Sequence, residues 1–425
     1  MLLSIADFNE GQVAAVDNLR QFLDPADPRA FYGLFGFAGT GKSTVLSFLG
    51  HTEIAHRRHI AMCAPTHKAV SVLQRMKTPR SALRHFETIH KMLHIKGRVD
   101  ERTGETVFET HNRFSEMPLI EKNFDTLVVD ECSMLDKEKV ELLEELVKHH
   151  DIKIIYVGDP YQLPPVTEEN LNKGRSYSFN VSSRTVLKEV ERSHGPVAAV
   201  THAARRAIGK DLRIDIPETE QTARLQSEAE LLRRFMPVCD TGQILTYYNA
   251  DVKKWNDRVR AQIHGPDVPH FVAGDRLSAA KTIGTISASQ EFVVREAKRV
   301  KHKDIECWQL SFEDELFRLF ACEPSQNQAR IAQETKLKKT WLDRRKKGHG
   351  SRQSYERWDE FRTTFQDLRH GYARTIHTSQ GSTYEQVFIE EGPLYDNFWK
   401  PHVLKFRGKL LYVAYSRAAK EIAVL

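Results

Sequence analysis

Apolar and polar positions in the first 160 residues follow two patterns in turn, which predict helices separated by short buried strands. Helical spacing of apolar residues is found at 11–23, 43–54 and 138–150. Nearly continuous apolar runs that are typical of buried strands lie at 31–37, 59–65, 125–131 and 152–159. Strands that alternate with helices predict a parallel α/β sheet. Each run ends in polar or turn residues, and in such sheets ligands bind where the strands end.

Two segments depart from this alternation. Between about 91 and 117, two alternating runs flank Arg102-Thr103-Gly104 and predict a β-hairpin outside the core of the first sheet. Between about 271 and 370, FVAGDRLSAA and EFVVREAKRV predict short antiparallel strands, and a basic helical stretch follows them. After residue 371 the alternation returns with GYARTIH, QVFIE and LLYVAYSRA. The chain is therefore predicted to be an α/β protein with two parallel-sheet domains and two insertions.

Composition excludes several classes of protein. The chain of 425 residues is long enough for two to three domains of roughly 100–200 residues each. No window approaches the roughly 18 apolar residues that a membrane span requires, and the acidic N-terminal segment does not resemble a secretory signal. The five cysteines are scattered without a CxxC pair, which disfavours a disulfide framework or a zinc site and favours a reducing cytoplasm.

Positive charge is concentrated late in the chain. Residues 331–370 hold 11 Lys/Arg against 6 Asp/Glu, and the segment 336–347 holds seven bases and one acid. A solvated helix face is the ordinary explanation of such a run. Contact with a polyanion is the alternative, because clustered Lys and Arg displace counterions from a phosphate backbone.

Residues 36–43, GFAGTGKS, match the pattern G-x-x-x-x-G-K-[ST] between a predicted strand and a predicted helix. Glycines let backbone N–H groups turn towards phosphate oxygens, and the helix N-terminus adds its positive dipole end. Lys42 is then placed for the β- and γ-phosphates and Ser43 for Mg²⁺. A plain glycine turn is the alternative that this context disfavours. The candidate ATP-binding residues of the loop are Gly36, Ala38, Gly39, Thr40, Gly41, Lys42, Ser43 and Thr44.

The segment LVVDECSM (127–134) supplies carboxylates at the end of another strand. Asp130 can hold Mg²⁺ through its water shell, and Glu131 can accept a proton from the attacking water. An exposed turn is the usual role of an Asp-Glu pair, but after a phosphate loop a hydrolysis site is favoured. Hydrolysis also calls for an arginine at the γ-phosphate, for which Arg192 and Arg417 are candidates that chemistry alone does not single out.

An uncharged amide follows the strand-like run at 152–159, in the segment VGDPYQLPPV (157–166). Asp159 ends the strand beside the one that delivers Asp130, so the loop after it is predicted to lie near the γ-phosphate. Three prolines stiffen this loop, and an amide can bind phosphate or water without adding negative charge. Gln162 is thus either a sensor of bound nucleotide or a plain turn residue.

Eight motifs taken together resemble those of superfamily 1 helicases, and more narrowly the 5′-to-3′ group, superfamily 1B, which includes RecD and the phage Dda helicase. The likeness is greatest to the phage Dda type, and it extends from about residue 9 to 418. The motifs are GFAGTGKST, APTHKAV (64–70), ETIH (87–90), VVDECSM, GDPYQLPPV, EVERS, TIHTSQGSTYEQV (375–387) and LLYVAYSRA (410–418).

The resemblance implies roles for further residues. Gln12 would read the adenine edge, and Gln162 would lie near the γ-phosphate. Arg192 and Arg417 would reach the nucleotide from a second motor domain. Residues of the motif that couples nucleotide to DNA would be Gln380, Gly381 and Glu385.

Single-stranded DNA would be contacted by hydroxyls that bind phosphates and by flat rings that lie against bases or sugars. The implied residues are Pro65, Thr66, His67, Thr88, His90, Thr375 and His377. Without the family, each histidine would be interpreted as an ordinary surface residue. Phe108, in the predicted hairpin, is the candidate wedge at the duplex fork, and ordinary packing of the hairpin is its alternative.

The resemblance also implies the domain organisation. Two RecA-like motor domains would comprise 1–90 with 118–175 and 176–270 with 371–425. The segment 91–117 would be the pin insertion, and 271–370 an SH3-like insertion with a basic helical arm. Within that insertion, Trp341 and Trp358 are expected to pack rather than to stack on bases.

The implied function is an ATP- and Mg²⁺-dependent DNA helicase that translocates 5′-to-3′ and unwinds duplex DNA in replication or recombination. Its partners would be single-stranded DNA, junctions of single and double strand, and a single-strand-binding or replication protein, with no membrane. It would act as a monomer in the cytoplasm of a bacterial or phage-infected cell. A small-molecule kinase or phosphotransferase and an RNA-directed helicase stay open as alternatives. A non-catalytic nucleic-acid scaffold is disfavoured because the expected ATP residues are all present.

Overall fold

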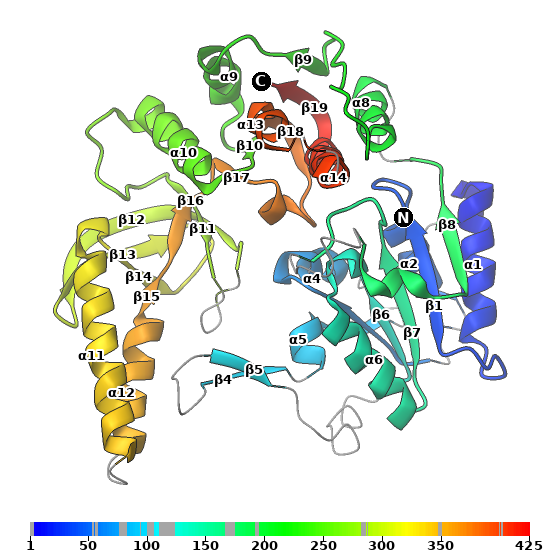
Figure 1. Ribbon diagram of the computed structural model, residues 1–425, viewed down its shortest axis with the longest axis horizontal. Coiled ribbons are helices and arrows are strands. Elements are labelled where there is room, and N and C mark those ends of the chain that lie inside the picture. Colours follow the sequence, from blue (N-terminus) through cyan, green and yellow to red (C-terminus); the bar gives the residue numbers. More distant parts are fainter. Residues whose placement is uncertain are drawn as a thin grey trace. The chain divides into compact units, whose positions relative to one another are not determined.

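The computed structural model divides into two compact units, described separately below (Figure 1). Unit 1 comprises Met1–Ile95, Thr110–Asn249 and Arg374–Leu425, and unit 2 comprises Lys96–Glu109 and Ala250–Ala373. The residues that the structure describes are 4–52, 55, 58–75, 83–93, 95–99, 106–109, 124–165, 175–191, 195–281, 286, 288–346, 351–398, 400 and 403–425.

The first sheet of unit 1 has six parallel strands. Their order is β3 (Leu83–Thr88), β2 (Ile60–Ala64), β6 (Thr126–Val129), β7 (Lys153–Gly158), β1 (Phe31–Gly36) and β8 (Arg184–Leu187). The helices that accompany it are α1 (Glu10–Leu23), α2 (Lys42–Leu49), α4 (His67–Gln74), α5 (Ile89–Met92) and α6 (Lys137–His149). The predicted parallel α/β architecture is confirmed.

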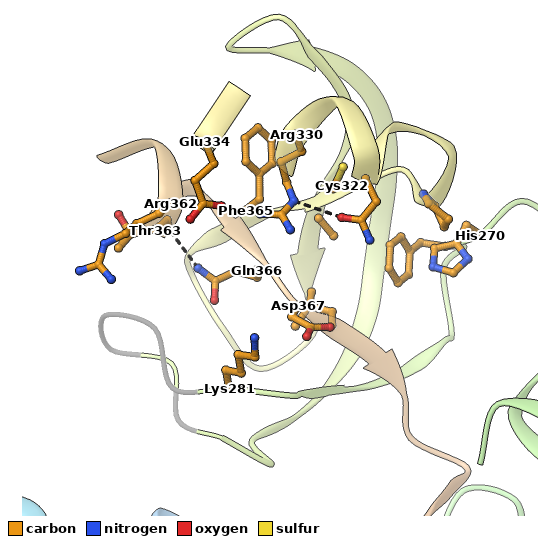
Figure 2. Close-up of a pocket in the computed structure, with 15 residues that line it drawn as sticks. His270, Lys281, Cys322, Arg330, Glu334, Arg362, Thr363, Phe365, Gln366 and Asp367 are labelled. Atoms are coloured by element: carbon orange, nitrogen blue, oxygen red, sulfur yellow. Dashed lines mark hydrogen bonds and ion pairs between the residues drawn. The ribbon is translucent and has the colours of Figure 1, made fainter. Parts of the chain in front are cut away.

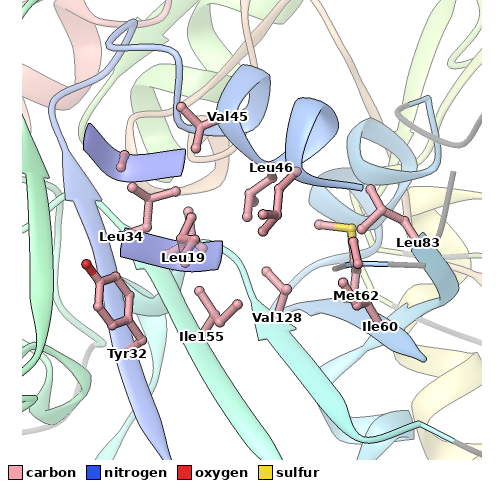
Figure 3. Close-up of a cluster of buried hydrophobic side chains, with 14 of the residues drawn as sticks. Leu19, Tyr32, Leu34, Val45, Leu46, Ile60, Met62, Leu83, Val128 and Ile155 are labelled. Carbon is pink, nitrogen blue, oxygen red and sulfur yellow. The ribbon is translucent and has the colours of Figure 1, made fainter. Parts of the chain in front are cut away.

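Both faces of this sheet are buried, which explains why its strands read as continuous apolar runs. Alternate residues of one strand enter different cores because successive side chains point to opposite faces. Tyr32 and Leu34 of β1 pack in the cluster that contains α1, α2 and α4 (Figure 3), whereas Phe35 packs with α5 and α6. The same division holds along β2, β6 and β7.

The second sheet of unit 1 has five strands. Their order is β17 (Ala373–Thr375), β10 (Gln243–Thr246), β18 (Tyr384–Ile389), β19 (Ala418–Val424) and β9 (Thr222–Arg224), and β10, β18, β19 and β9 pair in parallel. The helices of this part of the chain are α8 (Pro196–Arg206), α9 (Glu228–Phe235), α13 (Gly392–Asn397) and α14 (Leu404–Tyr415).

Unit 2 contains a mainly antiparallel sheet, a helical hairpin and a two-stranded ribbon. The sheet order is β15 (Phe365–Gln366), β14 (Arg318–Cys322), β13 (Ile305–Phe312), β12 (Glu291–His302), β11 (Arg276–Ala279) and β16 (Leu368–His370). The helices are α10 (Asn249–His264), α11 (Asn327–Lys346) and α12 (Ser351–Thr364). The ribbon pairs β4 (Lys96–Val99) with β5 (Thr106–Glu109) in antiparallel register, as predicted for this segment.

Trp341 of α11 and Trp358 of α12 stack on each other with ring centroids 5.1 Å apart and an interplanar angle of 10°. They are only 4% and 3% exposed. Their ring faces are therefore used to hold the two helices together, as the sequence predicted.

Two local expectations differ from the structure. The helix predicted at 43–54 ends at Leu49, where Gly50, a poor helix former, becomes the C-cap. Strand β8 pairs with β1 in the first sheet, although the sequence interpretation places 176–270 in the second domain. The segment LLYVAYSRA, where the alternation of strands and helices returns, contains the end of helix α14 and the start of β19. Within the described part of the chain, no helix is long and apolar enough to span a membrane.

Candidate active site

The glycine-rich loop at 37–41 joins β1 to α2 and has the backbone of a phosphate-binding loop. Gly39 and Gly41 have φ values of 81° and 79°, in the left-handed region that favours glycine. A Cβ at Gly41 would overlap the amide nitrogen of Gln12. Gly41 is also the N-cap of α2 and makes no side-chain cap, so the first amides of that helix keep their capacity to bind an anion.

Lys42, the first residue of α2, folds across the loop. Its Nζ donates hydrogen bonds to the carbonyl oxygens of Gly36 and Phe37, both at 2.8 Å. Ser43 follows it in the first turn of the helix. The ammonium group thus lies over the loop whose amides would surround phosphate, and the hydroxyl of Ser43 is at the helix end where Mg²⁺ would be held.

Asp130 and Glu131 follow strand β6 directly. The Asp130 N–H donates to the Cys63 carbonyl (2.8 Å), and the Glu131 N–H donates to Asp130 Oδ1 (2.8 Å). Burial and the negative charge of Glu131 raise the pKa of Asp130 to about 7, while the charge of Lys42 opposes the shift. Two carboxylates and the lysine are therefore brought within electrostatic range of one another, as the sequence predicted from strand ends alone.

Glu131 has a φ of 50°, which is uncommon for a residue with a side chain. Backbone strain of this kind persists only where the surrounding structure imposes it, and it often occurs at functional sites. The turn after β6 therefore fixes the direction in which this carboxylate leaves the chain.

The loop after β7 is tied to the phosphate loop by Asp159, which is fully buried. Its Oδ2 accepts from the Ala38 N–H at 3.0 Å and its Oδ1 from the Tyr161 N–H at 2.9 Å. Gln162 is 5% exposed, and its Oε1 is buried with no hydrogen-bond partner among the described residues. An unpartnered buried acceptor next to the phosphate loop fits a residue that binds only when nucleotide and its water are present.

Gln12 fastens α1 to the phosphate loop. Its Oε1 accepts from the Asn9 N–H at 3.2 Å, and its Nε2 donates to the Thr40 carbonyl at 3.2 Å. The first of these bonds is half of a capping box at the start of α1. In this structure the amide positions the loop, and the reading of adenine by Gln12 stays a prediction.

The structure describes one of the two candidate arginines, Arg417. Arg192 lies outside the described residues. Arg417 is buried, and its guanidinium donates to the carbonyls of Val413 and Ser382 and to Ser416 Oγ at 3.0–3.2 Å. These partners surround the start of β19, so Arg417 is held within the second sheet's own part of the chain.

Gly381, in the motif at 375–387, lies close to helix α4, which accompanies the first sheet. Its φ is 74°. A Cβ there would lie 3.7 Å from Ala69 Cβ, at the start of α4. Gln380 Nε2 lies 3.5 Å from the Leu163 carbonyl oxygen. Glu385, in contrast, forms an exposed ion pair with Lys420 at 2.9 Å.

Two of the three candidate DNA-facing threonines, Thr66 and Thr88, are N-caps of helices, whereas Thr375 precedes Ile376, the N-cap of a short 3₁₀ segment. Thr66 Oγ1 accepts from the Ala69 N–H at the start of α4, Thr88 caps α5, and Thr375 accepts from the Thr378 N–H. Pro65 precedes the first of these caps. The hydroxyls of Thr66 and Thr88 therefore each accept from one backbone N–H in the first turn of a helix, the end of a helix that attracts phosphate.

The three candidate histidines lie one or two residues after those threonines in the sequence. Desolvation lowers the pKa of His67, His90 and His377, which favours the neutral form of each ring. A neutral flat ring is suited to lie against a base or sugar. The side chain of Phe108 is outside the described part of the structure, although its backbone lies in β5 opposite Gly97.

Two residues in α14 contact the nucleotide loops and were missed by the sequence interpretation. Tyr412 Oη lies 2.6 Å from Asp159 Oδ2, and Lys409 Nζ donates to the carbonyls of Pro160 and Gln162. Their position gives no signal in the sequence, because the same helix also carries Lys405, Arg407 and Tyr415.

Unit 2 has a separate cavity of about 710 Å³ beside α11, α12 and β15 (Figure 2). Arg330 and Arg362 line it, but each has an acidic partner, Glu334 and Asp359 respectively. None of the candidate ATP residues line this cavity. It is therefore not the candidate active site.

Comparison with known proteins identifies the family. Residues 7–229, more than half of the chain, match the AAA domain family, and residues 370–425 match the UvrD-like helicase C-terminal domain. The chain belongs to the AAA domain family. The boundaries of the two matches enclose the phosphate loop and the carboxylates in the first, and Gly381 and Arg417 in the second.

Among proteins similar to this member of the family is the uncharacterized protein R530 of Acanthamoeba polyphaga mimivirus. It is 28% identical over 323 residues, which make up 69% of this chain and 65% of that protein.

The fold is that of Pif1 helicases. A structure of two coordinating Pif1 helicases, concerned with DNA unwinding at forked duplex DNA, is 17% identical with a TM-score of 0.54, covering 100% of this chain and 92% of that one. Bacteroides Pif1 in complex with ADP-AlF3 and single-stranded DNA is 15% identical with a TM-score of 0.52, covering 98% and 92%.

Proposed function

We propose that this chain is an ATP-dependent DNA helicase of superfamily 1B that translocates on single-stranded DNA and separates duplex DNA. The observation that carries the proposal is the meeting of Lys42, Asp130 and the Gln162 loop at one edge of the first sheet. A second α/β part, whose last residues match a helicase domain, belongs to the same compact unit. Phosphoryl transfer to water needs positioning and charge stabilisation, and these groups supply both.

The residues present fit a magnesium nucleotide. Ser43 and Asp130 would hold Mg²⁺ by their oxygens, and the loop amides with Lys42 would bind the phosphates. Glu131 would take the proton of the attacking water, and Arg192 and Arg417 would provide positive charge. The nucleotide and single strand bound to Bacteroides Pif1 support this choice of ligands.

We also propose the finer features that the sequence resemblance implied. These are 5′-to-3′ polarity, likeness to RecD and Dda helicases, a role in replication or recombination, action as a monomer in a bacterial or phage-infected cell, and handover from a single-strand-binding or replication protein. Duplexes with either a 5′ or a 3′ tail test the polarity directly. Unwinding only of the 3′-tailed substrate would contradict it.

Single-stranded DNA is expected to stimulate ATP hydrolysis. We expect the turnover rate to rise several-fold or more at saturating DNA, because the site that binds DNA and the site that hydrolyses ATP would be coupled. A steady-state ATPase assay with and without a DNA oligonucleotide measures it, and an RNA oligonucleotide of the same sequence is the matched comparison.

Other results would contradict the helicase proposal or support one of its alternatives. A rate that DNA leaves unchanged would contradict the helicase proposal, and phosphorylation of a small molecule would support a kinase. A larger stimulation by RNA than by DNA would support the RNA-directed alternative.

The wedge role of Phe108 also stays a proposal. Phe108→Ala is expected to slow unwinding of a tailed duplex several-fold while DNA-stimulated ATPase is largely retained, because the wedge acts only at the fork. Val107→Ala is the control, since its position in β5 alternates with that of Phe108. Equal losses of unwinding and ATPase, or equal losses in both variants, would show that Phe108 only packs the hairpin.

A further inference from the structure

Helix α14 carries two buried polar side chains that bind loops of the first sheet. Lys409 and Tyr412 are 3% and 1% exposed and lie three residues apart, on one face of the helix. Apolar and aromatic residues of α14, the ring of Tyr412 among them, pack in the core around the second sheet. Leu163, from the loop after β7, is buried in that same core cluster. The loop and the helix are thus packed together as well as hydrogen-bonded.

Tyr412 is bonded at the phosphate loop itself. Its O–H donates to Asp159 Oδ2 at 2.6 Å, and its oxygen accepts from the Ala38 N–H at 3.0 Å. The same N–H also donates to Asp159 Oδ2 at 3.0 Å. One amide of the phosphate loop is therefore shared between a carboxylate of the first sheet and a hydroxyl of α14.

Lys409 secures the neighbouring loop. Its Nζ donates to the carbonyl oxygens of Pro160 (2.8 Å) and Gln162 (2.7 Å). Burial lowers the pKa of Lys409 to about 8, while the negative charge of Asp159 opposes the shift. The backbone on which the Gln162 side chain is mounted is thus fixed to α14.

These contacts compete with nucleotide. Phosphate oxygens are bound in such loops by backbone N–H groups, and the Ala38 N–H is occupied by Tyr412 and Asp159. The Asp159 carboxyl group occupies the side of this amide to which a phosphate oxygen would have to come. Binding of phosphate at Ala38 must therefore displace or rearrange the bonds that tie α14 to the loop.

We propose that Tyr412 and Lys409 are positioning residues that couple the nucleotide loops to α14 and through it to the second sheet. When nucleotide binds, Tyr412 gives up its hydrogen bond with the Ala38 N–H, and a phosphate oxygen takes its place. Lys409 holds the Gln162 loop to α14, so that the loop and the helix move together. The proposal rests on the proposed helicase function for its effect on DNA-stimulated turnover. Its effect on nucleotide affinity does not depend on hydrolysis or on DNA.

Tyr412→Phe tests the exchange of the amide. The ring that packs in the core is kept, while the hydroxyl that holds Ala38 and Asp159 is lost. We expect Mg²⁺–mant-ADP, titrated by fluorescence, to bind about two- to twelvefold more tightly, the range that one net hydrogen bond corresponds to. DNA stimulation of ATPase should fall in the same variant. A loss of structure alone would weaken binding, so tighter binding separates the two causes.

Tyr415→Phe is the matched control. Tyr415 lies on the same helix, is fully buried, and donates to a carboxylate oxygen, Glu391 Oε2, at the same distance of 2.6 Å. Its partner belongs to the second sheet's side, so mant-ADP affinity and DNA stimulation should stay at the unsubstituted values. Unchanged or weaker mant-ADP binding in Tyr412→Phe, or equal effects in both variants, would overturn the proposal.

Lys409→Met tests the second contact, because methionine keeps the apolar stem and removes the ammonium. We expect DNA stimulation to fall several-fold with mant-ADP affinity unchanged, since Lys409 does not bind Ala38. Full stimulation in this variant would overturn its role. If wild-type protein binds mant-ADP but shows no DNA-stimulated ATPase, the helicase proposal fails while the Tyr412 result still decides the amide exchange.

Discussion

Replacing Lys42 with alanine is expected to reduce ATP turnover by about 10²–10³-fold or more, because a donor aimed at the charge that develops on the phosphates is lost. In the structure its Nζ lies over the phosphate loop, bonded to the carbonyls of Gly36 and Phe37. A nucleotide phosphate, which is negatively charged, would take the place of these neutral carbonyl partners. Steady-state phosphate release, measured with saturating single-stranded DNA, determines the loss.

The control for Lys42→Ala is Lys137→Ala, an exposed lysine that pairs with Glu141 on α6. It should keep wild-type turnover. Single-stranded DNA binding, measured by fluorescence anisotropy without nucleotide, should change little in either variant because Lys42 is not among the DNA-facing residues. ATP turnover within a few-fold of wild type would refute the phosphate-loop assignment.

The strands of the first sheet and the carboxylates are predictable from sequence for a physical reason. Strands buried on both faces leave continuous apolar runs, which locate β1, β2, β6 and β7 to within one or two residues. The carboxyl ends of parallel strands lie at one edge of a sheet, and this rule alone places Lys42 close to Asp130. Residues whose role depends on a strand end can thus be found from the order of apolar and polar positions.

Contacts made by helices of the second part of unit 1 cannot be predicted in this way. Tyr412 stands among apolar residues of α14 and Lys409 is one of its three basic residues, so neither is conspicuous, and their partners are more than 240 positions away. The pattern of apolar and polar positions does not show which loop a buried hydroxyl contacts. The sequence interpretation places strand β8 in the wrong sheet for a similar reason, since its edge position leaves only Leu187 fully buried.

Gln12 shows how a predicted site residue acquires a second role. Its amide is part of a capping box and of a bond to Thr40, so it holds the phosphate loop against α1. A polar residue at a helix start satisfies the backbone first, and any contact with adenine would be made by the remaining hydrogen-bonding capacity. Sequence motifs identify such a residue, and only the structure shows what it already binds.

Replacing Glu131 with glutamine is expected to separate turnover from metal binding. A general base contributes about 10²–10⁴-fold, so hydrolysis should fall by that order while nucleotide still binds. Glutamine has the same shape as glutamate, and so it suits the left-handed backbone of this position, φ 50°, equally well. Phosphate release and mant-ADP titration measure the two effects.

Glu131→Gln is also expected to change the Mg²⁺ concentration at half-saturation, because it changes the pKa of Asp130. The negative charge of Glu131 is one cause of the raised pKa of Asp130, so an uncharged glutamine lowers that pKa and favours the ionised form. An ionised Asp130 is the better magnesium ligand, and we expect half-saturation by Mg²⁺ at a lower concentration in Glu131→Gln than in wild type. Glu138→Gln, at the exposed start of α6, should change neither quantity. A Mg²⁺ requirement that rises together with the loss of turnover would instead place Glu131 itself on the metal.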